Sequence, residues 1–177
     1  MLNFPGFQIP ESRFYQLAGL CRIYSKFNVK KKEHLWLRSL TKFTTNNALR
    51  MVIPINPEKG YIMISYTDNF YADFWHQLYE KKGEMGVNLE LQRLMKQVLG
   101  ILIPMPIETR VFYWNCGVGY WGKGANSKII SERMICPFPD KKIYVCGENF
   151  SENNQQWMEG GLDTAVNVLE RMKQNGE

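Results

Sequence analysis

The chain has 177 residues, of which 45% are hydrophobic and 14% aromatic, and its formal net charge at pH 7 is +5. This composition suffices for a packed core and excludes an intrinsically disordered chain. Because no apolar run reaches the roughly 18 residues of a membrane span and no secretory signal precedes the fold, we predict an intracellular, cytoplasmic protein with no membrane partner and a single domain over residues 1–177.

Charge and cysteine spacing exclude two further kinds of site. The basic run at residues 30–32 is typical of a solvated loop, so no specific nucleic-acid partner is expected. The cysteines show no C-x-x-C or Cys/His ligand spacing, and we therefore predict no metal site. We interpret all four as reduced packing residues: Cys21, Cys116, Cys136 and Cys146.

The first part of the chain is predicted to be a lead-in, a strand and a connection. Residues 1–12 contain two prolines and a glycine and should be irregular. Residues 20–29 alternate apolar and polar side chains, which predicts a strand with two distinct faces. Residues 28–42 are mostly basic and polar, and their few apolar residues predict a small packed insert in the connection.

A β-hairpin is predicted next, from two apolar runs at residues 49–55 and 60–66. Pro57 at the second turn position and Gly60 at the end of the turn favour this connection. Pro54 cannot donate a hydrogen bond to a neighbouring strand, so we expect it at a sheet edge or a bulge.

Two helices follow the hairpin. Asp68 can cap the first, which should end near Gly83. Asn88 can cap the second, over residues 89–99, and Gly100 should end it.

Two features that suggest a site are interpreted otherwise. Residues 107–114 form a predicted strand, and the G-x-G-x-x-G motif of residues 117–122 follows it. Such a motif holds a dinucleotide only where it opens a helix, and here the chain is expected to continue as a loop. His76 has no carboxylate or cysteine motif beside it, which favours an exposed or core-edge histidine. We predict no catalytic residue in this chain.

The C-terminal region is the most informative. Residues 143–146 predict a short strand that runs through Gly147 into a loop and a helix, and a helix N-terminus attracts polar or anionic ligands. Gly160 and Gly161 lower helix propensity in the first turns, which indicates a close approach to the backbone. The helix has an apolar stripe: Met158, Leu162, Ala165, Leu169 and Met172.

Helices and strands in this order predict an α+β fold, with a mixed β-sheet and helices packed on one side. Four segments carry a family resemblance: residues 20–29, 53–75, 113–124 and 147–165. In them the chain resembles the flavin-containing amine oxidases, the family of monoamine and polyamine oxidases, and it resembles only their C-terminal, substrate-binding half.

The resemblance implies a fold and a set of site residues. Residues 13–140 would correspond to the substrate-binding domain, and residues 141–177 to the returning strand and helix of the FAD domain. Tyr120 and Trp157 would form two walls of an aromatic cage that guides the amine substrate to the flavin. The residues that would contact FAD are Gly147, Glu148, Trp157, Met158, Glu159 and Gly160.

The N-terminal FAD-binding βαβ unit of that family has no counterpart in this sequence. We therefore predict the substrate-binding portion of an FAD-dependent amine oxidoreductase, which alone neither binds FAD tightly nor oxidises amines. The alternative is a non-enzymatic structural or protein-interaction module derived from the same fold. Exposed apolar surface would favour association with an FAD-binding half or with a second copy of the chain.

Overall fold

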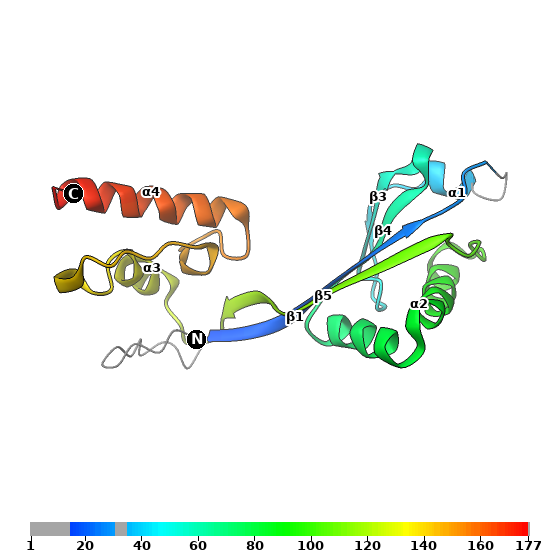
Figure 1. Cartoon of the computed structure of the whole chain (residues 1–177), viewed down its shortest axis with the longest axis horizontal. Helices are drawn as coiled ribbons and strands as arrows, with labels where there is room; N and C mark the ends of the chain where they lie inside the picture. Colours follow the sequence, from blue (N-terminus) through cyan, green and yellow to red (C-terminus); the bar gives the residue numbers. More distant parts are fainter. Residues whose placement is uncertain (1–14, 31–34, 177) are drawn as a thin grey trace. The chain divides into compact units, whose positions relative to one another are not determined.

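The computed structural model describes residues 15–30 and 35–176, and Figure 1 shows their helices and strands. The chain divides into two compact units. One unit runs from Ala18 to Gly117, and the other joins the residues before Ala18 to those after Gly117. The predicted division into a substrate-domain-like part, residues 13–140, and an FAD-domain-like part, residues 141–177, stays a prediction.

A five-stranded sheet has the order β2-β3-β4-β1-β5. Its strands are β1 (Tyr15–Lys26), β2 (Phe43–Thr44), β3 (Met51–Asn56), β4 (Tyr61–Asp68) and β5 (Glu108–Trp121). Together with the helices this confirms the α+β class.

The sheet is antiparallel, so the predicted mixed sheet is wrong. The pairs β1–β4, β2–β3 and β3–β4 are antiparallel. β5 also runs against β1, because Ile107 N–H donates to the Lys26 carbonyl while Gly117 lies against Leu20. The physical reason is that the helical connection from β4 to β5 passes over β1. β4 and β5 run parallel to each other, but β1 lies between them and is antiparallel to both.

The hairpin prediction is confirmed in its details. The turn between β3 and β4 is a short 3₁₀ helix (Pro57–Lys59), and Gly60 follows it with φ 83°. A side chain at Gly60 would collide with the Phe27 carbonyl, so this position requires glycine for space as well as conformation. Pro54 lies beside a register shift in the pairing with β4, as its missing N–H predicts.

The alternation predicted for residues 20–29 is confirmed, although the strand begins earlier, at Tyr15. One face of β1 is buried, with Cys21 and Ile23 in the core and Ser25 beside them, and the strand ends at Lys26, just before the buried Phe27 and earlier than predicted. The insert predicted after β1 is also present, as the short helix α1 (Leu35–Arg38) with Leu37 fully buried. The expectations for residues 1–12 and 31–32 lie outside the described residues.

Helix α2 (Asn69–Leu99) covers the buried face of the sheet (Figure 1). Trp75 is fully buried there, and its Nε1–H donates to the Ala48 carbonyl at 2.7 Å. Leu91 and Met95 of the same helix join this core. The core thus forms from one face of the sheet and the apolar side of α2.

The predicted helix ends are confirmed, but the predicted caps are not. Gly83 leaves the helical conformation (φ 61°, ψ −166°) and divides α2 into two segments, and Gly100 ends the helix in the left-handed conformation. Asp68 takes the N-cap position without a side-chain hydrogen bond. Asn88 is not a cap: the second segment begins directly after Gly83, so Asn88 is buried inside it and its Oδ1 has no hydrogen-bond partner.

The other unit contains α3 (Ser127–Ile135), which the sequence pattern did not predict, and α4 (Met158–Gln174), which it did. α4 packs against α3 and the short 3₁₀ helix Glu148–Phe150, as Figure 1 shows. The predicted strand at residues 143–146 is wrong. An isolated bridge joins Ile143 to Phe138, and the described residues offer this segment no longer partner strand.

The packing role predicted for the four cysteines is confirmed for Cys21 and is wrong for Cys116 and Cys146, while Cys136 is half-buried. Cys21 is fully buried in the core, and burial raises the pKa of its thiol to about 12. Cys116 and Cys146 are exposed. Within the described ranges, no helix is both long enough and apolar enough to cross a membrane.

Candidate functional site

The turn before α4 (residues 147–160) is organised around the Thr164 hydroxyl, which is buried. Its Oγ1 accepts a hydrogen bond from the Gly147 N–H at 3.0 Å and lies 2.9 Å from the Gly160 carbonyl, to which it can donate. A second acceptor, the Gly161 carbonyl, lies at 3.1 Å. One side chain therefore attaches Gly147 to the first turns of the helix. The sequence pattern contained Thr164 but gave no sign of this role.

Gly160 and Gly161 have different environments. A Cβ on Gly160 would collide with the Asn154 carbonyl, whereas a Cβ on Gly161 would reach no atom closer than 3.9 Å, the Glu148 nitrogen. The close approach to the backbone that was predicted from the two glycines is therefore present at Gly160 alone. The approaching group is the Asn154 carbonyl of the same chain. Asn154 is held by its own N–H, which donates to Ser151 Oγ at 3.0 Å.

The predicted FAD-contacting residues gather at this turn. Gly147 and Glu148 approach the first two turns of α4, at Thr164 and Gly161. At the start of α4, Gly160 is buried, while Trp157 is 70% exposed and Met158 84% exposed. Glu159 is exposed as well. The turn is thus internally fixed, yet its largest apolar side chains face solvent.

Tyr120 and Trp157, the two predicted walls of the aromatic cage, are connected through a hydrogen bond between the residues that precede them. Tyr120 lies on β5, and its hydroxyl donates to Gln16 Oε1 at 2.7 Å. Next to it, the Gly119 carbonyl accepts a hydrogen bond from Gln156 Nε2 at 3.4 Å, and Gln156 precedes Trp157. In the described part of the chain no ring contact joins Tyr120 to Trp157. The cage stays a prediction.

The apolar stripe of α4 does not face the interior. The buried residues of α4 are Gly160, Thr164 and Val168. Of the predicted stripe, Met158, Leu162 and Leu169 are exposed, Leu162 to 69%. The periodicity located the stripe correctly but could not show which side of the helix has a neighbour.

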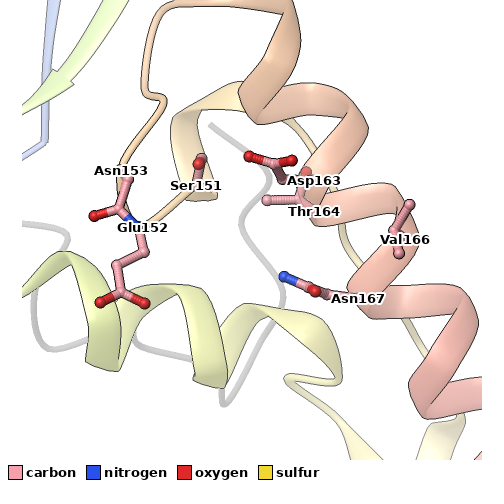
Figure 2. A pocket seen from close by; sticks show the side chains of 7 residues that line it. All are labelled: Ser151, Glu152, Asn153, Asp163, Thr164, Val166 and Asn167. Atoms are coloured by element: carbon pink, nitrogen blue, oxygen red, sulfur yellow. The ribbon is translucent and has the colours of Figure 1, made fainter.

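A polar cavity of about 300 Å³ adjoins the turn. Figure 2 shows its lining, with three residues from the loop before α4 and four from the helix: Ser151, Glu152, Asn153, Asp163, Thr164, Val166 and Asn167. Asp163 already accepts a hydrogen bond from Asn154 Nδ2 at 2.8 Å. Among the described residues no three His, Cys, Asp or Glu side chains come together as metal ligands. The cavity can therefore hold polar groups, and it offers no such metal-ligand cluster.

The glycine motif of residues 117–122 lies mostly within β5, which continues to Trp121, beyond the predicted strand end at residue 114, and the loop expected from Gly122 follows it. A Cβ on Gly117 would collide with Leu20, and one on Gly119 with Tyr15, so these glycines allow neighbouring segments to approach. α3 begins only at Ser127, with the Asn126 side chain as its cap. The motif is not the strand-to-helix turn that binds dinucleotides.

His76 lies at the edge of the core, as predicted, and stacks on Tyr113 with a ring separation of 4.0 Å. The Tyr113 hydroxyl donates to Asp73 Oδ1 at 2.8 Å, and this hydrogen bond raises the pKa of the tyrosine.

A second cavity, also of about 300 Å³, lies on the sheet in the 18–117 unit. It is lined by Tyr24, Ser25, Lys26, Tyr61, Glu108, Arg110 and Phe112. Sequence reasoning missed this group, although the alternation in β1 and β5 had already assigned most of these side chains to the face opposite the core.

Comparison of the chain with models of protein families found no match, and comparison with curated proteins found none either. The resemblance to flavin-containing amine oxidases therefore rests on the sequence segments named above.

Proposed function

We propose that this chain is the substrate-binding portion of an FAD-dependent amine oxidoreductase. The observation that carries the proposal is the turn before α4. Thr164 and Gly160 fix its backbone, while Trp157 and Met158 remain 70% and 84% exposed. Large apolar side chains on a fixed, exposed turn are suited to contact a flat apolar group or a partner protein.

The residues at this turn fit one end of a flavin. The N–H groups of Met158 and Glu159, the first two of α4, precede any acceptor within the helix and can donate to a ring carbonyl, whereas the Gly160 N–H already donates to the Trp157 carbonyl at 3.1 Å. Trp157 and Met158 offer apolar contact. The Glu148 carboxylate can accept hydrogen bonds from ribityl hydroxyl groups. The bound flavin would supply the oxidising chemistry, accepting hydride from the amine.

The same turn lacks most of what tight dinucleotide binding requires. No glycine turn at the start of a βαβ unit is present in the described chain to hold the pyrophosphate, and the sheet is antiparallel. We therefore expect the chain alone to bind FAD weakly and to be inactive. A separate FAD-binding half would complete the site.

Two titrations of the isotope-labelled chain test this proposal. Millimolar FMN should shift the amide signals of residues 147–161 and the Trp157 indole signal, and FAD should show no submicromolar affinity by calorimetry. The control is Trp75, an indole that is fully buried in the core of the other unit and should not move. The absence of shifts at residues 147–161 would contradict the flavin assignment. Submicromolar FAD binding with amine-dependent bleaching would contradict the predicted inactivity.

The second candidate function is a non-enzymatic interaction module. The exposed apolar stripe of α4 favours it, because such a stripe can pack against a partner or a second copy without any cofactor. A Leu162→Glu variant should then abolish concentration-dependent association in sedimentation experiments, while an Asn153→Glu variant, also exposed but outside the stripe, should not.

A further inference from the structure

The 18–117 unit has a second sheet face that α2 does not cover. Residues of β1 and β5 that alternate with the buried ones point to this side, which we call the open face. It comprises Arg22, Tyr24, Lys26, Tyr61, Tyr66, Glu108, Arg110, Phe112 and Trp114. A surface sheet face commonly carries scattered polar side chains, whereas this one combines five aromatic rings with three cations.

The aromatic rings of the open face are arranged in contact. Phe112 meets Tyr24 edge-on, with ring centroids 5.8 Å apart, and lies parallel to Trp114 at 6.2 Å. Phe112 remains 42% exposed and Trp114 45%. A flat ring placed against them would gain further aromatic contact.

The charges of the open face are unbalanced. Arg110 forms an ion pair with Glu108, with Nε 2.6 Å from Oε1. Lys26 lies over the Tyr61 ring, 5.0 Å from its centroid, and Arg22 lies over Tyr66 at 4.6 Å. In the described part of the chain neither Lys26 nor Arg22 forms an ion pair with a carboxylate.

Two further details support an anionic ligand. The Arg22 Nε is buried without a hydrogen-bond partner, so part of this guanidinium is already desolvated. The residue opposite Arg22 on the neighbouring strand is Tyr66; Asp68 lies two residues further along, opposite Leu20, and forms no ion pair with Arg22 in the described region. The cavity on this face carries two cations and one carboxylate in its lining, and so has an excess of one positive charge.

We propose that the open face binds a small ligand that carries both an aromatic ring and a carboxylate, with the carboxylate at Lys26 and the ring against Tyr24 and Phe112. The cavity volume of about 300 Å³ fits a ligand of this size.

The experiment compares two probes of equal shape and opposite charge, 3-phenylpropionate and 3-phenylpropylamine, by NMR titration of the full chain. The carboxylate probe should bind in the millimolar range and shift the signals of Tyr24, Lys26 and Phe112. Lys26→Gln should weaken its binding about fivefold, the ratio that corresponds to an exposed ion pair of about 1 kcal/mol. Lys96→Gln, at an exposed lysine on α2, is the control and should have no effect.

Each outcome decides the proposal. Binding of 3-phenylpropionate with loss in Lys26→Gln supports it. Equal or tighter binding of 3-phenylpropylamine, or no shift at these three residues with either probe up to 20-fold above about 1 mM, overturns it. A well-dispersed amide spectrum of each variant shows that it is folded. No flavin is added in this titration. A negative result with the phenyl probes therefore does not bear on the flavin contacts proposed for residues 147–161, and a negative flavin titration does not bear on the open face.

Discussion

Helices α2 and α4 both carry an apolar stripe, and the two stripes have opposite environments. That of α2 is buried against the sheet, with Trp75 and Met95 fully covered. That of α4 is exposed at Met158, Leu162 and Leu169, and the buried residues of this helix are Gly160, Thr164 and Val168 instead. The difference shows that periodicity identifies an apolar face but not its neighbour. α2 derives its stability from apolar burial, and α4 derives much of its attachment from one hydroxyl and one glycine.

The largest effect should come from removing a side chain of the α2 stripe. Trp75→Ala should destabilise the 18–117 unit by about 3–5 kcal/mol, because it removes a fully buried indole and its hydrogen bond to Ala48. Leu162→Ala in the α4 stripe should change stability by about 0.5 kcal/mol or less. Urea denaturation measures both, and similar losses would mean that the α4 stripe is packed in solution.

The two glycines of α4 allow a sharper comparison within one helix. Gly160→Ala should destabilise the C-terminal unit by about 1–3 kcal/mol, because the new methyl group collides with the Asn154 carbonyl. Gly161→Ala has room and should stabilise the helix by up to about 1 kcal/mol. Circular dichroism during thermal unfolding gives both values. Equal effects of the two variants would show that the turn before α4 is not packed as described.

The smallest effect on stability near neutral pH is expected from the cysteines. They should nevertheless differ clearly in how fast they react with a thiol reagent. At pH 8 a thiol reagent should label Cys116 and Cys146 rapidly and Cys21 only after unfolding, because Cys21 is buried and its thiol pKa is raised to about 12. Since the folded state holds this proton more tightly than the unfolded state, stability should fall as pH rises from 9.0 towards 12. Mass spectrometry identifies the labelled residues. Rapid labelling of Cys21 in the folded protein would contradict its burial.

Local signals predicted the parts of the fold that depend on local backbone geometry. Gly60, Gly83 and Gly100 all adopt positive φ, which glycine tolerates best, so each could be placed from the sequence. Asn88 failed as a cap because a capping residue cannot be distinguished from the same residue one turn inside a helix. The strand at residues 143–146 failed because a strand needs a partner, which no local pattern reveals.

The sequence likewise predicted one part of the candidate sites and missed another. Gly147, Glu148 and residues 157–160 do come together at one turn, because they are close in sequence and joined by one helix end. The open face was missed because its members come from three strands that the sheet order alone brings together. Lys26, Tyr61 and Phe112 are far apart in the sequence, and each in isolation is an ordinary surface residue.

The break at Gly83 has a consequence for how α2 can change length. In a continuous helix one inserted residue rotates everything after it by about 100°, which would move Leu91 and Met95 out of the core. Gly83 interrupts the helical phase, and Glu84 fixes the second segment independently by accepting a hydrogen bond from the Thr109 N–H at 2.9 Å. Insertions beside Gly83 can therefore be absorbed at the break, so the two segments of α2 are free to vary in length separately.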